Sequence, residues 1–499
     1  MKLTVTEKPL NILHRDLKTN LADPMCRLGN VTSISGRELV SLVLDTDKGT
    51  ALCWVSPLAE DSYPALTNTI PQAHWFERVV HDMFGLIPEG HPRLKHVLIH
   101  DAYPLGFHPL RKYPSRTQPA PGSNEFQFLE VTGEGVYEIP VGPIHAGVIE
   151  PGHFRFSCLG ETILNLELKL GYVHRGVEKR LTQVPWRKAR YVAEAAAGDT
   201  ATASALAHAV AVESLFDMPA PPAAQHLRSI ALEIERLAVH IIDVGGIATD
   251  TGLLGIAQSM SRLRGNALGM GEMIAGSRFM RAFICPGGVT RNTVSKLPGI
   301  AVVARKLKND LEKPLSILQD NQVLRERCEH VGEIRTSLAQ EFGLVGVAGR
   351  AAGIGYDTRL SFDQGVFPRY APNIAVQQSG DIWARTAVRI AEIWSSLDCI
   401  IDLAENLPYG ASGSSGSILE TLPEKLPADS AAAGIVEAFR GELIHMIFTD
   451  ERGQILRYCI KDPSMNNWTA VPIAIRNNLI ADFPLCNKSF ALAYSGHDL

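Results

Sequence analysis

The chain has 499 residues, of which 45% are hydrophobic and 20% are charged, and its formal net charge is −5. This composition is typical of a globular protein with two to four domains, and it excludes wholesale disorder and a nucleic-acid-binding surface. The N-terminal stretch has no apolar signal core, and no uncharged apolar run reaches the length that spans a bilayer. We therefore expect a cytoplasmic chain that reaches the membrane only through partner proteins.

The first 120 residues predict an α+β unit. Residues 40–44 and 50–55 alternate like short strands around a turn-rich loop, and residues 73–84 have the spacing of a helix. A stretch dense in proline and glycine follows. Its restricted backbone favours an ordered connector or a linker, so we place a domain of residues 1–120 before a linker of residues 121–135.

The remaining residues, 136–499, are richer in alanine and leucine and predict a mainly helical domain with small β-hairpins. Apolar residues recur at helical spacing in 223–244, and 255–274 and 381–403 are further expected helices. Residues 441–460 have the pattern of a β-hairpin. The last 18 residues are too apolar for a frayed end, so we expect them to dock in the core or on a partner, with Leu499 as the mature end.

Cysteines and histidines give no metal motif by spacing alone. The eight cysteines contain no C-x-x-C pair, which favours reduced core residues. Six of the seven histidines of the N-terminal unit crowd into its second half: His74, His81, His91, His96, His100 and His108. Because their spacing fits no known zinc pattern, we expect packing, capping and interface roles for them.

Two segments resemble the metal cradle of the nickel–iron hydrogenase family. They are Arg175-Gly176-Val177-Glu178 with its continuation at 194–200, and Asp462-Pro463-Ser464-Met465-Asn466-Asn467. The resemblance implies four cysteine ligands, whose places are taken here by Ala197, Thr200, Ser464 and Asn467. Nickel and iron in this cradle need thiolate sulfur, so we expect no nickel–iron site and no hydrogenase activity.

Two further blocks extend the resemblance over nearly the whole chain. Residues 75–85, 91–94 and 108–112 resemble the 30-kDa subunit of respiratory complex I, and residues 142–156 and 171–179 resemble the 49-kDa subunit. The second block is closer still to the large, component G-like subunit of hydrogenase-4 and formate hydrogenlyase complexes. The resemblance implies an N-terminal 30-kDa-like α+β domain, then a mainly helical 49-kDa-like domain.

The resemblance also implies partners and cofactors. We expect a small iron–sulfur subunit that carries the cluster, and a membrane arm of antiporter-like and quinone-module-like subunits at the cytoplasmic face of the inner membrane. The resemblance implies that this chain is an oxidoreductase-type subunit, similar to those of NADH:quinone oxidoreductases or of hydrogenases. Quinone binding and NAD binding are functions of complexes of this kind. We expect this chain itself to bind no cofactor other than, in one interpretation, a quinone.

If the cradle frame is retained, several ionisable groups are expected to converge on it: Glu150, His153, Glu178, Glu194, Asp199 and Asp462. Acids gathered in a low dielectric acquire raised, coupled pKa values that suit proton relay. The candidate relay is His153, Asp199, Glu178 and Glu194. The resemblance implies quinone contacts at His153 and near Trp186 and Tyr191. In the alternative interpretation the acids form structural pairs with Arg155, Arg175, Arg190 and Lys179.

Three functional hypotheses follow. The first is a nickel-free, peripheral-arm subunit of a cation-translocating redox complex, with a pocket for a quinone-like or unknown acceptor. The second is a non-catalytic scaffold between an iron–sulfur subunit and the membrane arm. The third, a hydrogenase with unusual ligands, conflicts with the missing sulfur.

Overall fold

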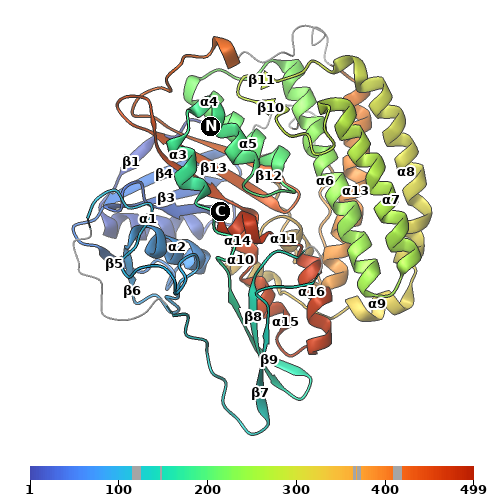
Figure 1. The fold of residues 1–499 in the computed structure, drawn as a ribbon, viewed down its shortest axis with the longest axis horizontal. Helices are drawn as coiled ribbons and strands as arrows, with labels where there is room; N and C mark the ends of the chain where they lie inside the picture. Colours follow the sequence, from blue (N-terminus) through green and yellow to red (C-terminus); the bar gives the residue numbers. More distant parts are fainter. Residues whose placement is uncertain (115–124, 147–148, 363–366, 368–371, 408–418) are drawn as a thin grey trace.

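The computed structural model describes residues 1–499 except 115–124, 147–148, 363–366, 368–371 and 408–418. Mixed helix and sheet fill the described part (Figure 1). The expected linker at 121–135 is described only from residue 125 onward, where it is coil and turn, and Leu129 donates its N–H to Glu167 of the neighbouring strand at 2.6 Å. This described part is therefore an ordered connector laid over another surface.

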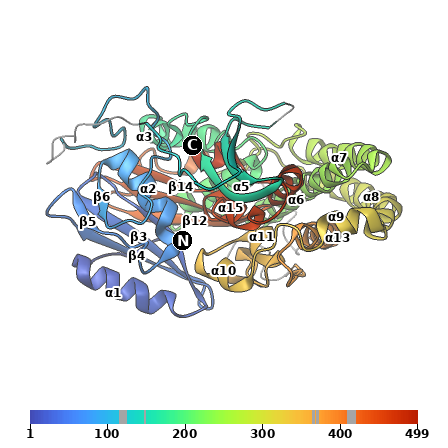
Figure 2. The ribbon, with the colours of Figure 1, turned by 90° about the horizontal axis from the view of Figure 1, so that it is seen from below.

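The N-terminal unit is built on a four-stranded sheet in the order β1-β4-β3-β2. β1 (Val5–Glu7) runs parallel to β4 (Thr50–Pro57), and β3 (Glu38–Asp45) is antiparallel to both β4 and β2 (Cys26–Thr32). The two expected strands, 40–44 and 50–55, are confirmed and lie within β3 and β4. Helix α1 (Leu10–Leu21) covers one face of this sheet (Figure 2).

The two faces of this sheet join two different parts of the molecule. Side chains alternate along β3, so Leu39 and Val43 belong to the same core as the buried leucines of α1. Val40, Leu42 and Leu44 point the other way and pack against a second sheet. The N-terminal unit is thereby fixed to the C-terminal domain by a sheet-on-sheet contact.

The second sheet has the order β12-β13-β14 and is almost entirely buried. The expected hairpin is confirmed by β13 (Gly441–Thr449) and β14 (Ile455–Lys461). β12 (Ala431–Ala438) was not predicted. Its small residues let helix α5 (Ala201–Phe216) pack directly against the strand. A side chain at Gly434 would prevent this contact, because its Cβ would lie 1.9 Å from the Ala207 carbonyl oxygen.

Four long helices form a bundle beside this sheet, on the right in Figure 1. The expected helices are confirmed as α6 (Pro222–Asp250), α7 (Leu254–Ala275) and α13 (Ile382–Glu405), each longer than expected or of similar length. α8 (Leu297–Gln319) was not singled out from the sequence. α5 starts directly after the cradle turn, and Glu235 in the middle of α6 accepts the N–H groups of Thr202 and Ala203, so the bundle holds the cradle turn in place.

A three-stranded antiparallel sheet, β7-β8-β9, projects from the body at the bottom of Figure 1. Its strands are β7 (Val136–Val141), β8 (His153–Leu159) and β9 (Thr162–Lys169). The loop between β7 and β8 carries the Gly142-to-Gly152 motif. This sheet presents that loop to the C-terminal tail.

The C-terminal tail packs into the chain's own core. Helices α16 (Phe483–Phe490) and α17 (Tyr494–Asp498) contain buried apolar residues, and Leu499 is buried. The expectation that the tail docks is confirmed, with the core of this chain as its seat. The shorter elements are α2 (His74–Phe84), α3 (Val177–Gln183), α4 (Trp186–Glu194), α9 (Gln322–Cys328), α10 (Thr336–Glu341), α11 (Gly346–Ala351), α12 (Thr358–Ser361), α14 (Pro463–Asn467), α15 (Ala470–Ile475), β5 (Ser62–Pro64), β6 (Ile87–Glu89), β10 (Ile284–Cys285) and β11 (Gly288–Val289).

Across the described residues, we find no helix that combines the length and apolar character required to cross a bilayer.

Candidate functional site

The four residues that replace the cysteine ligands of the nickel–iron family are buried in the core or hydrogen-bonded within the chain. Ala197 is buried and offers no ligand atom. Thr200 donates to Asp199 at 3.1 Å, and the Ser464 hydroxyl accepts the N–H of Ala493 at 3.0 Å. The Asn467 amide bonds the N–H and the carbonyl of one residue, Val345. Neutral, engaged oxygens of this kind are poor ligands for a soft metal pair.

A buried cation lies between the two halves of the cradle. The guanidinium of Arg440, at the β12–β13 turn, donates to both carboxylate oxygens of Asp199, at 2.9 and 2.7 Å, and to Thr200 at 3.2 Å. Burial alone would lower the pKa of Arg440, but the carboxylates of Asp199 and Asp462 raise it above its ordinary value. Arg440 therefore stays charged and repels any further cation in the cradle.

The donor set in the cradle does not fit a nickel–iron pair. Within the part of the chain that the structure describes, His, Cys, Asp and Glu gather in metal-compatible sets at two places, both outside the cradle: His81, Asp82 and His96, and His330, Glu333 and Asp381. The cradle itself offers a methyl group, engaged hydroxyls and an amide around a fixed guanidinium. The chemistry of this site is therefore that of ion pairs and protons.

Next to the cradle lies a cavity of about 720 Å³, which we call the cradle cavity. Its apolar wall is Val141, Ile149, Phe154, Phe483, Pro484, Ala491, Leu492 and Tyr494. Its polar wall is His145, Glu150, Gly198, Asp199, Asp243, Asp250, Arg440, Asn487, Lys488 and Ser495. The volume lies within the range of small-molecule sites, and the lining combines an apolar wall with a wall rich in charged groups.

Most charges around the cradle cavity are paired. Lys488 of α16 pairs with Asp250 of α6 at 2.5 Å, and Arg389 of α13 pairs with Asp243 at 3.1 Å. Glu150, in the β7–β8 loop, accepts the backbone N–H groups of Tyr494 and Ser495 at 3.1 and 2.9 Å. These bonds fasten the loop and the tail to each other in the wall of the cavity.

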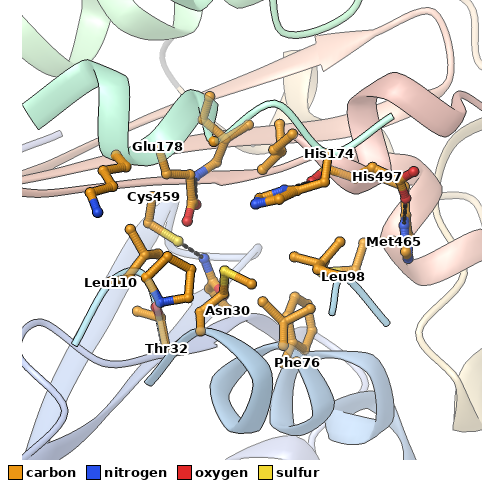
Figure 3. Close-up of a pocket in the computed structure, with 18 of the residues that line it drawn as sticks. Asn30, Thr32, Phe76, Leu98, Leu110, His174, Glu178, Cys459, Met465 and His497 are labelled. Atoms are coloured by element: carbon orange, nitrogen blue, oxygen red, sulfur yellow. Dashed lines mark hydrogen bonds and ion pairs between the residues drawn. The ribbon is translucent and has the colours of Figure 1, made fainter. Parts of the chain in front are cut away.

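Glu178 lies in a second, smaller cavity between the two domains (Figure 3). Its carboxylate accepts from Arg457 at 2.8 Å and from the N–H of Ile460 at 2.8 Å. Opposite it, the Asn30 amide donates to the Cys459 sulfur at 3.0 Å. The volume is about 50 Å³, which holds a few water molecules and no organic ligand.

Of the six ionisable groups expected to converge on the cradle, three lie at it and Glu178, His153 and Glu194 make their contacts elsewhere. Asp199 and Glu150 line the cradle cavity, and Asp462 caps α14 beside it by accepting the Ser464 N–H. Glu178 faces the smaller cavity because Arg457 holds it there. Glu194 turns to the Ala282 N–H, at 3.0 Å from each carboxylate oxygen.

The two expected quinone contacts also lie away from this cavity. The His153 ring packs 5.2 Å from the Phe128 ring, and its Nδ1 is 3.2 Å from the Gly142 carbonyl oxygen. Burial lowers the pKa of His153, whereas burial raises that of Glu194. Tyr191 is 49% exposed, and Arg190 donates to its hydroxyl at 2.6 Å. The functional roles of these residues stay predictions.

In the alternative interpretation the acids form structural ion pairs. Asp199 and Glu178 do form ion pairs, but with arginines other than the expected ones. Arg155 pairs with Glu138 at 2.9 Å, and Arg175 donates to backbone carbonyls, among them Ala196 at 2.7 Å. The counterions of Asp199 and Glu178 are instead Arg440 and Arg457, both on the second sheet. Spacing along the sequence could not have identified these distant partners.

One titratable group that the sequence reasoning missed is Glu235 of α6. Its carboxylate accepts the N–H groups of Thr202 and Ala203, at 2.6 and 3.0 Å, at the start of α5. Burial, with a contribution from the Asp199 charge, raises its pKa to about 7. The sequence did contain a sign of this group, because Glu235 is the second glutamate, after Glu233, within the apolar helical pattern of residues 223–244.

Comparisons with known proteins agree with this architecture. Residues 10–119 match the respiratory-chain NADH dehydrogenase 30 Kd subunit family, and residues 250–498 match the 49 Kd subunit family. Formate hydrogenlyase subunit 5 of Escherichia coli (strain K12) is 29% identical over 93% of this chain and 82% of its own length. Hydrogenase-4 component G of the same organism is 28% identical over the same shares.

A solved structure shows the same fold. A chain of the membrane-bound sulfane sulfur reductase, an archaeal respiratory membrane complex, superposes with a TM-score of 0.68 at 24% identity. The match covers 74% of this chain and 100% of that one. The fold and the two matched regions define a fused two-domain subunit of the complex I type. The chain carries fused respiratory-chain 30-kDa-type and 49-kDa-type domains, and it is similar to the formate hydrogenlyase and hydrogenase-4 subunits, as its motifs indicated.

Proposed function

We propose that this chain is a peripheral-arm subunit of a membrane-associated, cation-translocating redox complex, and that its cradle cavity receives the electron acceptor. The observation that carries this proposal is the cavity of about 720 Å³ beside a cradle whose ligand positions no longer fit a metal. Such a cavity suits a flat aromatic head group of the quinone kind. His145 and the Arg440–Asp199 pair would supply the polar contacts.

Partners follow from the relatives. One further relative is named as the alpha subunit of a membrane-bound hydrogenase, and the solved structure is that of a respiratory membrane complex, so a membrane arm is proposed for this chain too. A small subunit carrying an iron–sulfur cluster would deliver electrons, and antiporter-like and quinone-module-like subunits would form the membrane arm. The proposed location is the cytoplasmic face of the inner membrane.

Proton delivery to a reduced acceptor is assigned to this chain's own groups. Asp199 keeps a pKa below its ordinary value, because the Arg440 charge outweighs its burial, so Asp199 orients Arg440 and holds no proton near neutral pH. Glu235, with a pKa of about 7, exchanges a proton in the physiological range behind the same turn. This arrangement supplies one fixed charge and one exchangeable proton.

The test is binding of a short-chain ubiquinone to the purified chain by isothermal titration calorimetry. Ile149 lines the cavity, whereas Ile144, in the same loop, is 87% exposed and lies outside the lining. Ile149→Trp should weaken binding at least tenfold by filling the cavity, and Ile144→Trp should leave it unchanged. Similarly, His145→Ala should weaken binding, and His153→Ala should not.

Absence of binding to the wild-type chain and to the complex that co-purifies with it would refute the acceptor site. The scaffold function would then remain, since the fold still presents the surfaces that partners need. Equal loss in both tryptophan variants would point to a disturbed loop and would equally contradict the cavity as the site.

A further inference from the structure

A second cluster of ligating groups lies in the N-terminal unit, outside the cradle. His81 and Asp82 are in the last turn of α2, which ends at Gly85 in the left-handed conformation (φ 67°). His96 comes back to the same place from the segment after β6. The three potential ligand atoms, two imidazole nitrogens and one carboxylate oxygen, all lie within 4.8 Å of one another.

The carboxylate of this cluster is held in place by the backbone. Asp82 is fully buried, and its Oδ2 accepts the N–H groups of Val97 and Leu98 at 2.7 and 2.8 Å. These bonds leave Oδ1 facing the two histidines. An outer shell of backbone donors that orients a carboxylate is a common feature of protein metal sites.

The two imidazoles offer their Nδ1 atoms to this same oxygen. His96 Nδ1 is 2.6 Å from Asp82 Oδ1, and His81 Nδ1 is 3.6 Å from it. At 3.6 Å there is no hydrogen bond, and among the described residues the buried His81 Nδ1 makes none. A buried ring nitrogen without a hydrogen bond is costly, which is a second sign that the cluster accepts a ligand.

The spacing suits a tetrahedral ion. With bonds of about 2.0–2.1 Å, such an ion separates its ligand atoms by about 3.3 Å. The observed separations from Asp82 Oδ1, 2.6 Å to His96 and 3.6 Å to His81, bracket that value, and all three ligand atoms lie within 4.8 Å of one another. Both imidazole side chains are about a quarter exposed, at 24% and 23%, which gives the ion an entry path.

We propose that His81, Asp82 and His96 form a site for one Zn²⁺ ion, with water as the fourth ligand. Two nitrogens and one carboxylate are a donor set that zinc prefers. The ion would tie the end of α2 to the segment of residues 95–99. That segment also reaches the C-terminal domain, because Lys95 pairs with Glu167 of β9 at 2.5 Å. The site thereby stiffens the junction of the two domains.

The experiment uses the full chain, stripped with a chelator and then titrated with Zn²⁺ by calorimetry and with Co²⁺ by visible absorption. We expect one tight equivalent, a tetrahedral cobalt spectrum and a thermal midpoint raised by about 5 °C on zinc addition. His81→Ala and His96→Ala should each weaken binding at least 100-fold. His330→Ala, in the other candidate set, should bind like wild type.

Unfolding of the metal-free variants, followed by circular dichroism, separates lost ligation from lost structure. His81→Gln and His96→Gln, which keep side-chain volume, serve as a second pair. Lack of tight zinc binding in the wild type overturns the proposal. Equal binding in the His81→Ala/His96→Ala double variant overturns it too, since the ion would then be adventitious.

Discussion

Arg440 and Asp199 form a two-point ion pair across the emptied cradle, with N···O distances of 2.9 and 2.7 Å. The pair joins the β12–β13 turn to the turn before α5, which are distant in sequence and adjacent in the fold. The Arg440 side chain is 8% exposed, whereas the Asp199 side chain, which lines the cavity, is 45% exposed. The pair therefore anchors the two turns to each other. The buried Arg440 charge needs the Asp199 carboxylate as its counterion, whereas Asp199 is partly solvated.

Removing the carboxylate should destabilise the protein. Asp199→Ala leaves the Arg440 charge buried without its counterion, which costs about 3–5 kcal/mol for a fully buried pair. Because Asp199 is almost half-exposed, solvent screening reduces the expected loss to about 1–3 kcal/mol. Urea denaturation measures it. The loss should appear above about pH 4 and vanish as the pH falls through the lowered pKa of Asp199.

Two variants control this prediction. Lys308→Ala removes an exposed pair with Asp398 and should cost less than about 1 kcal/mol. Arg440→Met in the Asp199→Ala background should restore part of the lost stability, because the uncompensated charge is gone. A double variant less stable than Asp199→Ala would contradict the anchor interpretation.

Glu235 should impose a pH dependence on stability. Its pKa is raised from 4.5 to about 7 in the folded chain, so the native state holds a proton that the unfolded state has released. Native stability therefore falls as the pH rises from about 4.5 to about 7. Glu235→Gln keeps an acceptor for the α5 N–H groups and removes this titration.

The measurement is urea denaturation of wild type and variant at a series of pH values. Relative to wild type, Glu235→Gln should gain about 3 kcal/mol between pH 4 and pH 8, in order of magnitude. For Glu312→Gln, at an exposed position of α8, the free energy of unfolding should change with pH as it does in wild type. Parallel curves for Glu235→Gln as well would show that Glu235 is not protonated near neutral pH.

Gly434 should be intolerant of any side chain. A Cβ there would lie 1.9 Å from the Ala207 carbonyl oxygen, so Gly434→Ala must push α5 away from β12. We expect a loss of about 3 kcal/mol or more and weaker acceptor binding, because α5 carries the cradle turn. Gly265→Ala, in an open position of α7, should instead gain about 1 kcal/mol. Equal thermal midpoints for the two variants would contradict this account.

The helices and the hairpin could be predicted because their periodicities are local. Residues 223–244 and 381–403 repeat apolar side chains at helical spacing, and both are helices. β12 could not be predicted, because Ala431 to Gly434 lacks the β-branched residues that favour strands. Its position depends on the helix that it packs against, which is tertiary information.

The candidate site was predictable in its location and only partly in its contacts. Asp199 was expected to need a partner, but Arg440 lies on a distant turn that no local pattern links to it. His153 starts strand β8, and which face of a sheet it takes depends on strand register. Register and ion-pair partners are set by long-range packing, so the cavity lining had to come from the structure.

The purified chain should contain far less than one nickel atom. Ala197 offers no ligand, the Ser464 hydroxyl and Asn467 amide are engaged, and Arg440 places a positive charge between the two halves of the cradle. Elemental analysis of the chain from cells grown with added nickel measures this, and zinc in the same sample reports the separate histidine site. Stoichiometric nickel that disappears in a Thr200→Val/Ser464→Ala variant would contradict the assignment and restore the hydrogenase hypothesis.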